Sequence, residues 1–85
     1  MAFYKVRAEL KGPVGDYEHK LAGIGCKYAA ITNPVADILP QLTHQTFYVI
    51  REGREGEKKA KDLVSILRKL DFVSKAHSIK YGEGD

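Results

Sequence analysis

The sequence predicts a small single α+β domain, in which a mainly antiparallel sheet of about four strands packs on one long and one short helix. Three observations carry this prediction. Residues Phe3–Lys11 alternate between apolar and polar side chains, as a half-buried strand does. Residues Thr46–Ile50 form a short run of aromatic and β-branched side chains, which favours a second strand. Residues Glu57–Val73 repeat apolar side chains at helical spacing.

Length and composition fit one soluble domain. The chain has 85 residues, which suits a modest core and argues against a multidomain enzyme. Its net charge of +3 permits an anionic partner without requiring one. A lone cysteine, Cys26, excludes an internal disulfide and a multi-cysteine metal site. Because the sequence shows neither a signal-peptide pattern nor an apolar run long enough to span a bilayer, we expect a cytoplasmic protein without a membrane partner.

The N-terminal strand is expected to have one buried and one solvent-facing side. Its apolar positions alternate with charged positions, so the two sets point to opposite faces of the sheet. The inner set comprises Tyr4, Val6, Ala8 and Leu10, and the outer set comprises Phe3, Lys5, Arg7, Glu9 and Lys11. Residues Gly12–Asp16 then form a turn, which lacks the Gly-Lys-Ser/Thr ending of a phosphate-binding loop.

Residues Tyr17–Ile31 admit two interpretations. Apolar side chains recur at helical spacing, but Gly23 and Gly25 interrupt the pattern, and each glycine inside a helix costs about 1 kcal/mol relative to alanine. We therefore expect a strand that pairs with the first strand and bends at Gly23–Gly25. If the stretch is helical instead, the first half of the chain runs strand, helix, strand.

A short helix is expected after Thr32-Asn33-Pro34. Thr and Asn can cap a helix, and Pro suits its first position. Pro40 predicts that the helix ends or kinks after two or three turns. The apolar side chains that follow at helical spacing are expected to pack against the core, and they are Val35, Ile38, Leu39 and Leu42.

The strand Thr46–Glu52 carries apolar side chains on both faces. Phe47 and Val49 lie on one face, and Tyr48 and Ile50 lie on the other. This pattern predicts a central strand that is covered on both sides. If the second face is open, Tyr48 and Ile50 become an exposed apolar patch, which is typical of partner-binding surfaces.

The rest of the chain is expected to form a charged loop at Arg51–Gly56, a helix at Glu57–Val73 and a returning strand at Ser74–Tyr81. The helix has one apolar side that suits the core. This side comprises Ala60, Leu63, Val64, Leu67 and Leu70. We expect one domain over residues 1–81 and a flexible tail over residues 82–85.

No constellation of residues predicts catalysis, a metal site or a cofactor. His19, His44 and His77 lie far apart and lack the spacing of a helical metal site. Cys26 is expected to be a small buried residue beside the glycine bend, since nothing in the sequence supplies the base that a nucleophile needs. Asp62 lies among lysines of the long helix, which predicts a local ion pair.

A surface that combines cations with aromatic rings is the most specific functional signal. Such a sheet face suits unpaired bases and phosphates, although interleaved glutamates such as Glu9 and Glu55 are also typical of an ordinary solvated surface. The candidate partner-binding residues are Phe3, Lys5, Arg7, Tyr48, Arg51, Arg54, Lys58, Lys59 and Lys61.

The predicted arrangement resembles, in outline, the ferredoxin-like α+β sandwich, which also underlies RNA-recognition domains. The aromatic-rich motif of those domains is a basic-Gly-aromatic-Gly-aromatic run on the third strand. Residues Thr46-Phe47-Tyr48-Val49-Ile50 do not match it. The glycine-rich turn of acylphosphatases carries an arginine, and Gly12–Gly15 contains none.

We therefore expect a small non-catalytic regulatory or adaptor protein. It would dock on a macromolecular partner, a protein or a nucleoprotein, through the basic and aromatic surface. The first alternative is a protein that binds single-stranded RNA or DNA, and the second is a small enzyme that uses His19, Cys26 or His77. We expect no cofactor, and a homodimer could bury an exposed sheet edge.

Overall fold

The computed structural model describes residues 2–33 and 38–82. Within this part of the chain, the presence of four strands and of the helices α1 and α3 confirms the α+β prediction. Neither helix described there is long and apolar enough to cross a membrane. The elements are β1 (Phe3–Leu10), the 3-10 helix η1 (Val14–Asp16), α1 (Glu18–Lys27), β2 (Ala30–Thr32), β3 (His44–Val49), α3 (Gly53–Leu67) and β4 (Val73–Tyr81).

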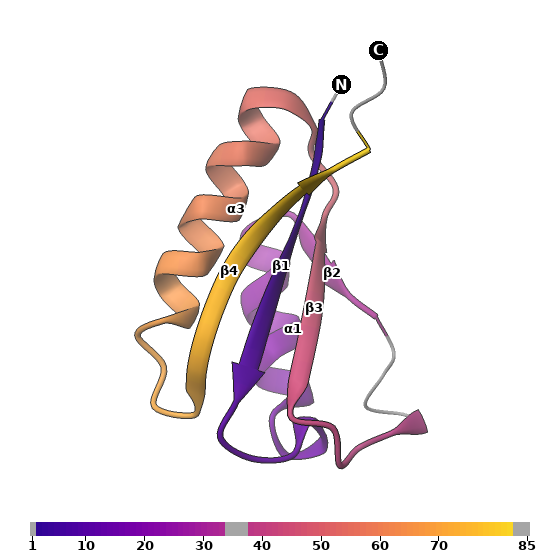
Figure 1. The fold of residues 1–85 in the computed structure, drawn as a ribbon, viewed down its shortest axis with the longest axis vertical. Helices are drawn as coiled ribbons and strands as arrows, with labels where there is room; N and C mark the ends of the chain where they lie inside the picture. Colours follow the sequence, from indigo (N-terminus) through magenta and orange to yellow (C-terminus); the bar gives the residue numbers. More distant parts are fainter. Residues whose placement is uncertain (1, 34–37, 83–85) are drawn as a thin grey trace.

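The strands form a 4-stranded sheet in the order β2-β3-β1-β4, and all neighbours are antiparallel (Figure 1). The first strand therefore lies inside the sheet, where Val6 is opposite Phe47 on one side and Ser78 on the other. The register shifts between Glu9 and Leu10, where β1 meets the start of β4. This order agrees in outline with the ferredoxin-like resemblance.

Both helices cover the same face of the sheet, and the core lies between the two layers (Figure 1). The inner side of β1 is buried as predicted, and Val6 is fully inaccessible to solvent. Phe47 from β3, Leu21 from α1 and Leu63 from α3 meet it there, each with 0% exposure. Burying a side chain of this size contributes about 1.5–3 kcal/mol, so the helix layer is held mainly by apolar contact.

The expectation of a bent strand in Tyr17–Ile31 is wrong, because residues 18–27 form α1. Gly25 is buried, and a Cβ at this position would lie 3.0 Å from the Ala30 carbonyl oxygen and 3.1 Å from the Phe47 ring. The helix accepts this glycine because its missing side chain lets α1 approach the sheet closely. Gly23 faces open space, so it makes no close contact that requires a glycine. It destabilises the helix only through the low intrinsic helix propensity of glycine.

The apolar stripe predicted after Pro34 does not pack as expected. Residues 34–37, where that helix would begin, lie outside the described residues. Ile38 and Leu39 are 74% and 53% exposed, whereas Leu42 packs against the core. The backbone of this segment is held by η1, since the Pro40 carbonyl accepts a hydrogen bond from the Gly15 N–H at 3.0 Å. The helix that accompanies α3 over the sheet is α1.

The long helix begins earlier and ends earlier than predicted. The sequence predicted a loop at Arg51–Gly56, but Gly53–Gly56 is the first turn of α3. Gly53 has a φ of 65° and its N–H donates to the Ala2 carbonyl at 3.0 Å, which fixes a tight entry into the helix. Past Leu67 the chain turns toward β4, which confirms the predicted returning strand.

Replacing Ala29 by glycine is expected to stabilise the protein by up to about 1 kcal/mol. Ala29 connects α1 to β2 with a φ of 53°, a conformation that costs an L-residue roughly 1–2 kcal/mol, and the greater freedom of glycine in the unfolded chain offsets part of the gain. Urea denaturation measures the difference in free energy of unfolding. The control Ala22→Gly, at an exposed position inside α1, should lose about 1 kcal/mol. If both variants lowered the free energy of unfolding equally, the inference that the backbone at Ala29 is strained would be wrong.

Candidate functional site

One face of the sheet is left uncovered by the helices, and we call it the open sheet face. It is built from the side chains that alternate with the buried positions of each strand. Figure 1 shows the strands lying in front of α1 when this face is viewed. The open sheet face comprises Phe3, Lys5, Arg7 and Glu9 of β1, Ile31 of β2, His44, Thr46 and Tyr48 of β3, and Lys75, His77, Ile79 and Tyr81 of β4.

Aromatic rings gather at one end of the open sheet face, around Lys5. Phe3 pairs with Tyr81 across β1 and β4, their ring centroids are 6.1 Å apart, and they are 39% and 37% exposed. Lys5 is opposite Tyr48 in the register, and its Nζ lies 5.3 Å from the centroid of the Tyr81 ring. A cation over a ring face is attracted by the ring quadrupole, so Lys5 is held among exposed rings.

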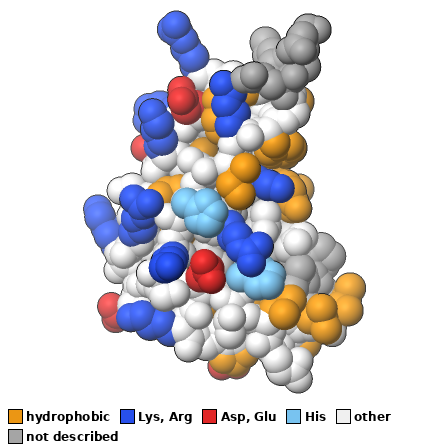
Figure 2. Space-filling model, in the orientation of Figure 1, with side chains coloured by type: hydrophobic (Ala, Val, Ile, Leu, Met, Phe, Trp, Pro, Cys, Tyr) orange, Lys and Arg blue, Asp and Glu red, His pale blue; other side chains and the backbone are white. Residues whose placement is uncertain are grey.

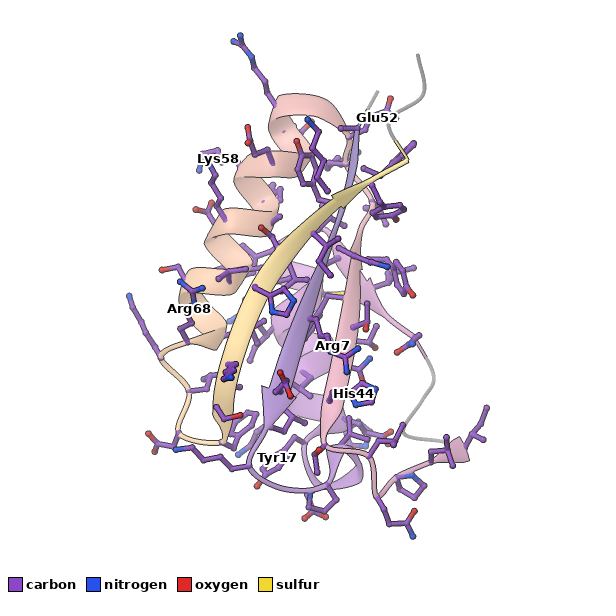
Figure 3. All side chains as sticks on the ribbon, in the orientation of Figure 1. Arg7, Tyr17, His44, Glu52, Lys58 and Arg68 are labelled. Atoms are coloured by element: carbon purple, nitrogen blue, oxygen red, sulfur yellow. The ribbon has the colours of Figure 1, made fainter. Side chains whose placement is uncertain are left out.

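The other end of the open sheet face is polar and carries more cations than carboxylates among its described residues. Arg7 is opposite Thr46 on β3 and His77 on β4, while Glu9 is opposite His44 and Lys75. Figure 3 shows Arg7 and His44 on the same side of neighbouring strands. Figure 2 shows Lys and Arg side chains gathered toward the α3 side of this view and hydrophobic side chains toward the β2 side.

The structure divides the predicted partner-binding surface into two parts. Four of its members, Phe3, Lys5, Arg7 and Tyr48, lie together on the open sheet face. The remaining members belong to the entry into α3 or to α3 itself, which covers the opposite face, and Figure 3 shows Lys58 pointing away from the sheet. These are Arg51, Arg54, Lys58, Lys59 and Lys61.

Of the five predicted cations at the entry into α3 or in α3 itself, three have carboxylate partners one helical turn away. Lys58 Nζ lies 3.0 Å from an oxygen of Asp62, which confirms the predicted local ion pair. Arg51 pairs with Glu55 at 3.7 Å, and Lys61 pairs with Glu57 at 3.8 Å. Such exposed pairs contribute little to stability, and they lower the net charge of this surface. The open sheet face is therefore the better candidate site.

Sequence reasoning left out several residues that the structure adds to this face. His77, Ile79 and Tyr81 come from β4, and Ile31 comes from β2. The alternation of β4 is visible in the sequence and could have assigned its side chains to two faces. The sequence does not reveal that β4 pairs with β1, and this pairing places Tyr81 beside Phe3.

The residues considered for catalysis lie on different elements. Cys26 is exposed on α1, so the expectation of a buried cysteine is wrong; it lies on the outer side of the helix rather than at a bend. His19 is also on α1, with a side chain that is 99% exposed, whereas His77 belongs to β4. Within residues 2–33 and 38–82, no group of three His, Cys, Asp or Glu side chains could hold a metal ion.

No protein-family model matches the chain, and no curated protein and no solved structure matches it either. The open sheet face is therefore the feature from which a function can be inferred. Its distinctive property is that Lys5 of β1 lies opposite Tyr48 of β3 and close to the Tyr81 ring of β4.

Proposed function

We propose that the chain is a non-catalytic binding module that docks on a macromolecular partner through the open sheet face, and that this partner is a single-stranded nucleic acid. The observation that carries the proposal is the position of Lys5. It lies directly across from Tyr48 and 5.3 Å from the Tyr81 ring. Unpaired bases stack on aromatic side chains while cations contact the phosphates between them, and this face offers both groups.

Each end of the face would have a separate role. In this proposal, bases stack on the exposed Phe3–Tyr81 pair and on the half-buried Tyr48. Arg7 lies one alternate position along β1 from Lys5, so the two cations can contact successive phosphates. A duplex hides the faces of its bases, so this arrangement favours a single strand.

Changing Tyr48 to alanine is expected to lower the affinity for a single-stranded oligonucleotide by roughly 5- to 150-fold, since stacking on one ring contributes about 1–3 kcal/mol. Arg7→Ala should weaken binding and also reduce its dependence on salt, because one phosphate contact is lost. Fluorescence anisotropy with labelled DNA and RNA strands at about 50 mM salt measures both effects.

The matched control is Lys58→Ala, which removes the same charge from the outer side of α3, far from the open sheet face. It should leave the affinity nearly unchanged. The proposal is wrong if no strand binds at about 50 mM salt, where the electrostatic contribution is large. It is also wrong if Lys58→Ala weakens binding as much as Arg7→Ala does.

A protein partner is the second candidate, and the exposed isoleucines favour it. Ile31 is 58% exposed on β2, and Ile50, which follows β3, is 59% exposed. Apolar and aromatic side chains beside an arginine are also common at the centre of protein interfaces. An association with a protein, including a second copy of this chain, that weakens on Ile31→Ser and changes little with salt would support this candidate.

A further inference from the structure

A groove of about 610 Å³ runs between α3 and β4, at the outer edge of the sheet. Among the residues that the structure describes, the ionisable side chains of its lining are cations and one histidine, without a carboxylate. An anionic occupant is therefore favoured by charge. The polar lining residues are Lys61 and Ser65 of α3, Arg68 and Lys69 directly after α3, and His77 and Ser78 of β4.

Arg68 is fixed in this groove by the sheet itself. Its Nε donates a hydrogen bond to the Ala76 carbonyl at 3.0 Å, and Figure 3 shows Arg68 at the end of α3, beside β4. A guanidinium has five N–H donors in a planar fork, so this bond leaves the two terminal nitrogens with their donors for a ligand. That fork matches the oxygens of a phosphate group.

The same hydrogen bond argues against an extended peptide as the occupant. β4 is the outer strand of the sheet, and a peptide adding to its edge would need the Ala76 carbonyl as an acceptor. Arg68 already occupies that carbonyl. A chain of phosphates can instead bind the guanidinium without displacing it from the strand.

The groove is continuous with the open sheet face through His77. This residue lines the groove and is also directly opposite Arg7 in the pairing of β1 with β4. Residues paired in this way have Cα atoms about 4.5–5.5 Å apart. A row of basic and histidine side chains thus leads from Arg7 at the sheet centre, over β4, to Arg68.

We propose that the groove between α3 and β4 binds phosphate groups of a single nucleic-acid strand where it leaves the open sheet face. This inference rests on the proposed function. Bases would stack on the sheet, and the following phosphates would cross the edge at His77 and reach Arg68 and Lys69. The groove then lengthens the bound segment without adding any base-specific contact.

The test compares labelled oligo-dT strands of about 4 and about 12 nucleotides, since the shorter strand can occupy the sheet alone. In the double variant Arg68→Gln/Lys69→Gln, we expect the affinity for the longer strand to fall roughly tenfold, with a salt dependence reduced by about two phosphate contacts. The affinity for the shorter strand should not change. Glutamine at position 68 retains a donor for Ala76, and the single variant Lys69→Gln gives a smaller loss without touching that bond.

The control double variant Lys27→Gln/Lys58→Gln removes the same charge from exposed positions outside the groove and should bind both strands normally. If the longer strand binds the groove variant and the unchanged protein equally, the groove assignment is wrong and the proposed function stands. If neither strand binds the unchanged protein, the proposed function is wrong, and the groove assignment that rests on it is wrong as well. Tighter binding of a polyglutamate peptide than of the longer strand, lost on Arg68→Gln/Lys69→Gln, would assign the groove to acidic protein segments and overturn the inference.

Discussion

Replacing Phe47 by alanine is expected to lower the free energy of unfolding by about 3–5 kcal/mol, the usual cost of removing a large ring from a core. Phe47 is fully buried on the inner side of β3, and its ring is the close neighbour of Gly25 in α1. The loss therefore loosens the contact of α1 with the sheet as well as leaving a cavity. Since domains of this kind are stable by only about 5–15 kcal/mol, urea denaturation should show a much lower midpoint.

Phe3→Ala is the matched control, because it removes the same ring from a side chain that is 39% exposed on the open sheet face. Its effect on the free energy of unfolding should stay below about 1 kcal/mol. The same variant should weaken binding to a single strand, because Phe3 pairs with Tyr81. Equal destabilisation by the two variants would contradict the division between the core side and the open side of the sheet.

Replacing Gly56 by alanine is expected to destabilise the protein by about 3 kcal/mol, at the upper end of the costs of overpacking. Gly56 is buried in the first turn of α3, and an added Cβ would lie 2.9 Å from the carbonyl carbon of Arg51 and 3.2 Å from the Tyr4 ring. The first of these neighbours is backbone, so it cannot move aside without shifting the entry into the helix. Thermal unfolding followed by circular dichroism measures the loss.

Gly23→Ala makes the same chemical change where nothing lies within 4 Å of the added atom. Because alanine favours a helix by about 1 kcal/mol over glycine, this variant should be more stable than the unchanged protein. The two substitutions should therefore have opposite signs. A destabilised Gly23→Ala variant together with a neutral Gly56→Ala variant would contradict the packing described for both helices.

The parts of the fold that depend on local pattern were predictable from the sequence. The alternation in β1 placed Val6 inward and Arg7 outward, and the helical spacing in α3 placed Leu63 in the core. The local pattern was misleading in α1, where glycine argued against a helix. A side chain at Gly25 would collide with Phe47, a residue far along the chain. A local sequence pattern cannot reveal such a long-range contact.

The candidate site was only half predictable, because it also depends on contacts between residues that are far apart in the sequence. Phe3, Lys5 and Arg7 share one strand, so their common face follows from the sequence alone. Their neighbours Tyr81 and His77 depend on which strands pair, and strand order is a property of the whole chain. Proximity in the sequence also misplaced Arg54, which follows β3 closely but belongs to the helix layer.

The central position of β1 has a consequence for the order of folding events. Val6 pairs with Phe47 and with Ser78, so β1, near the start of the described chain, pairs with the last two strands, β3 and β4. Closing such long loops costs conformational entropy before any contact repays it, so refolding should be slower than that of a helical bundle of similar size. Until β4 pairs with β1, one backbone edge of β1 is unpaired. Another chain can pair with this edge in the partly folded state, so self-association competes with folding there.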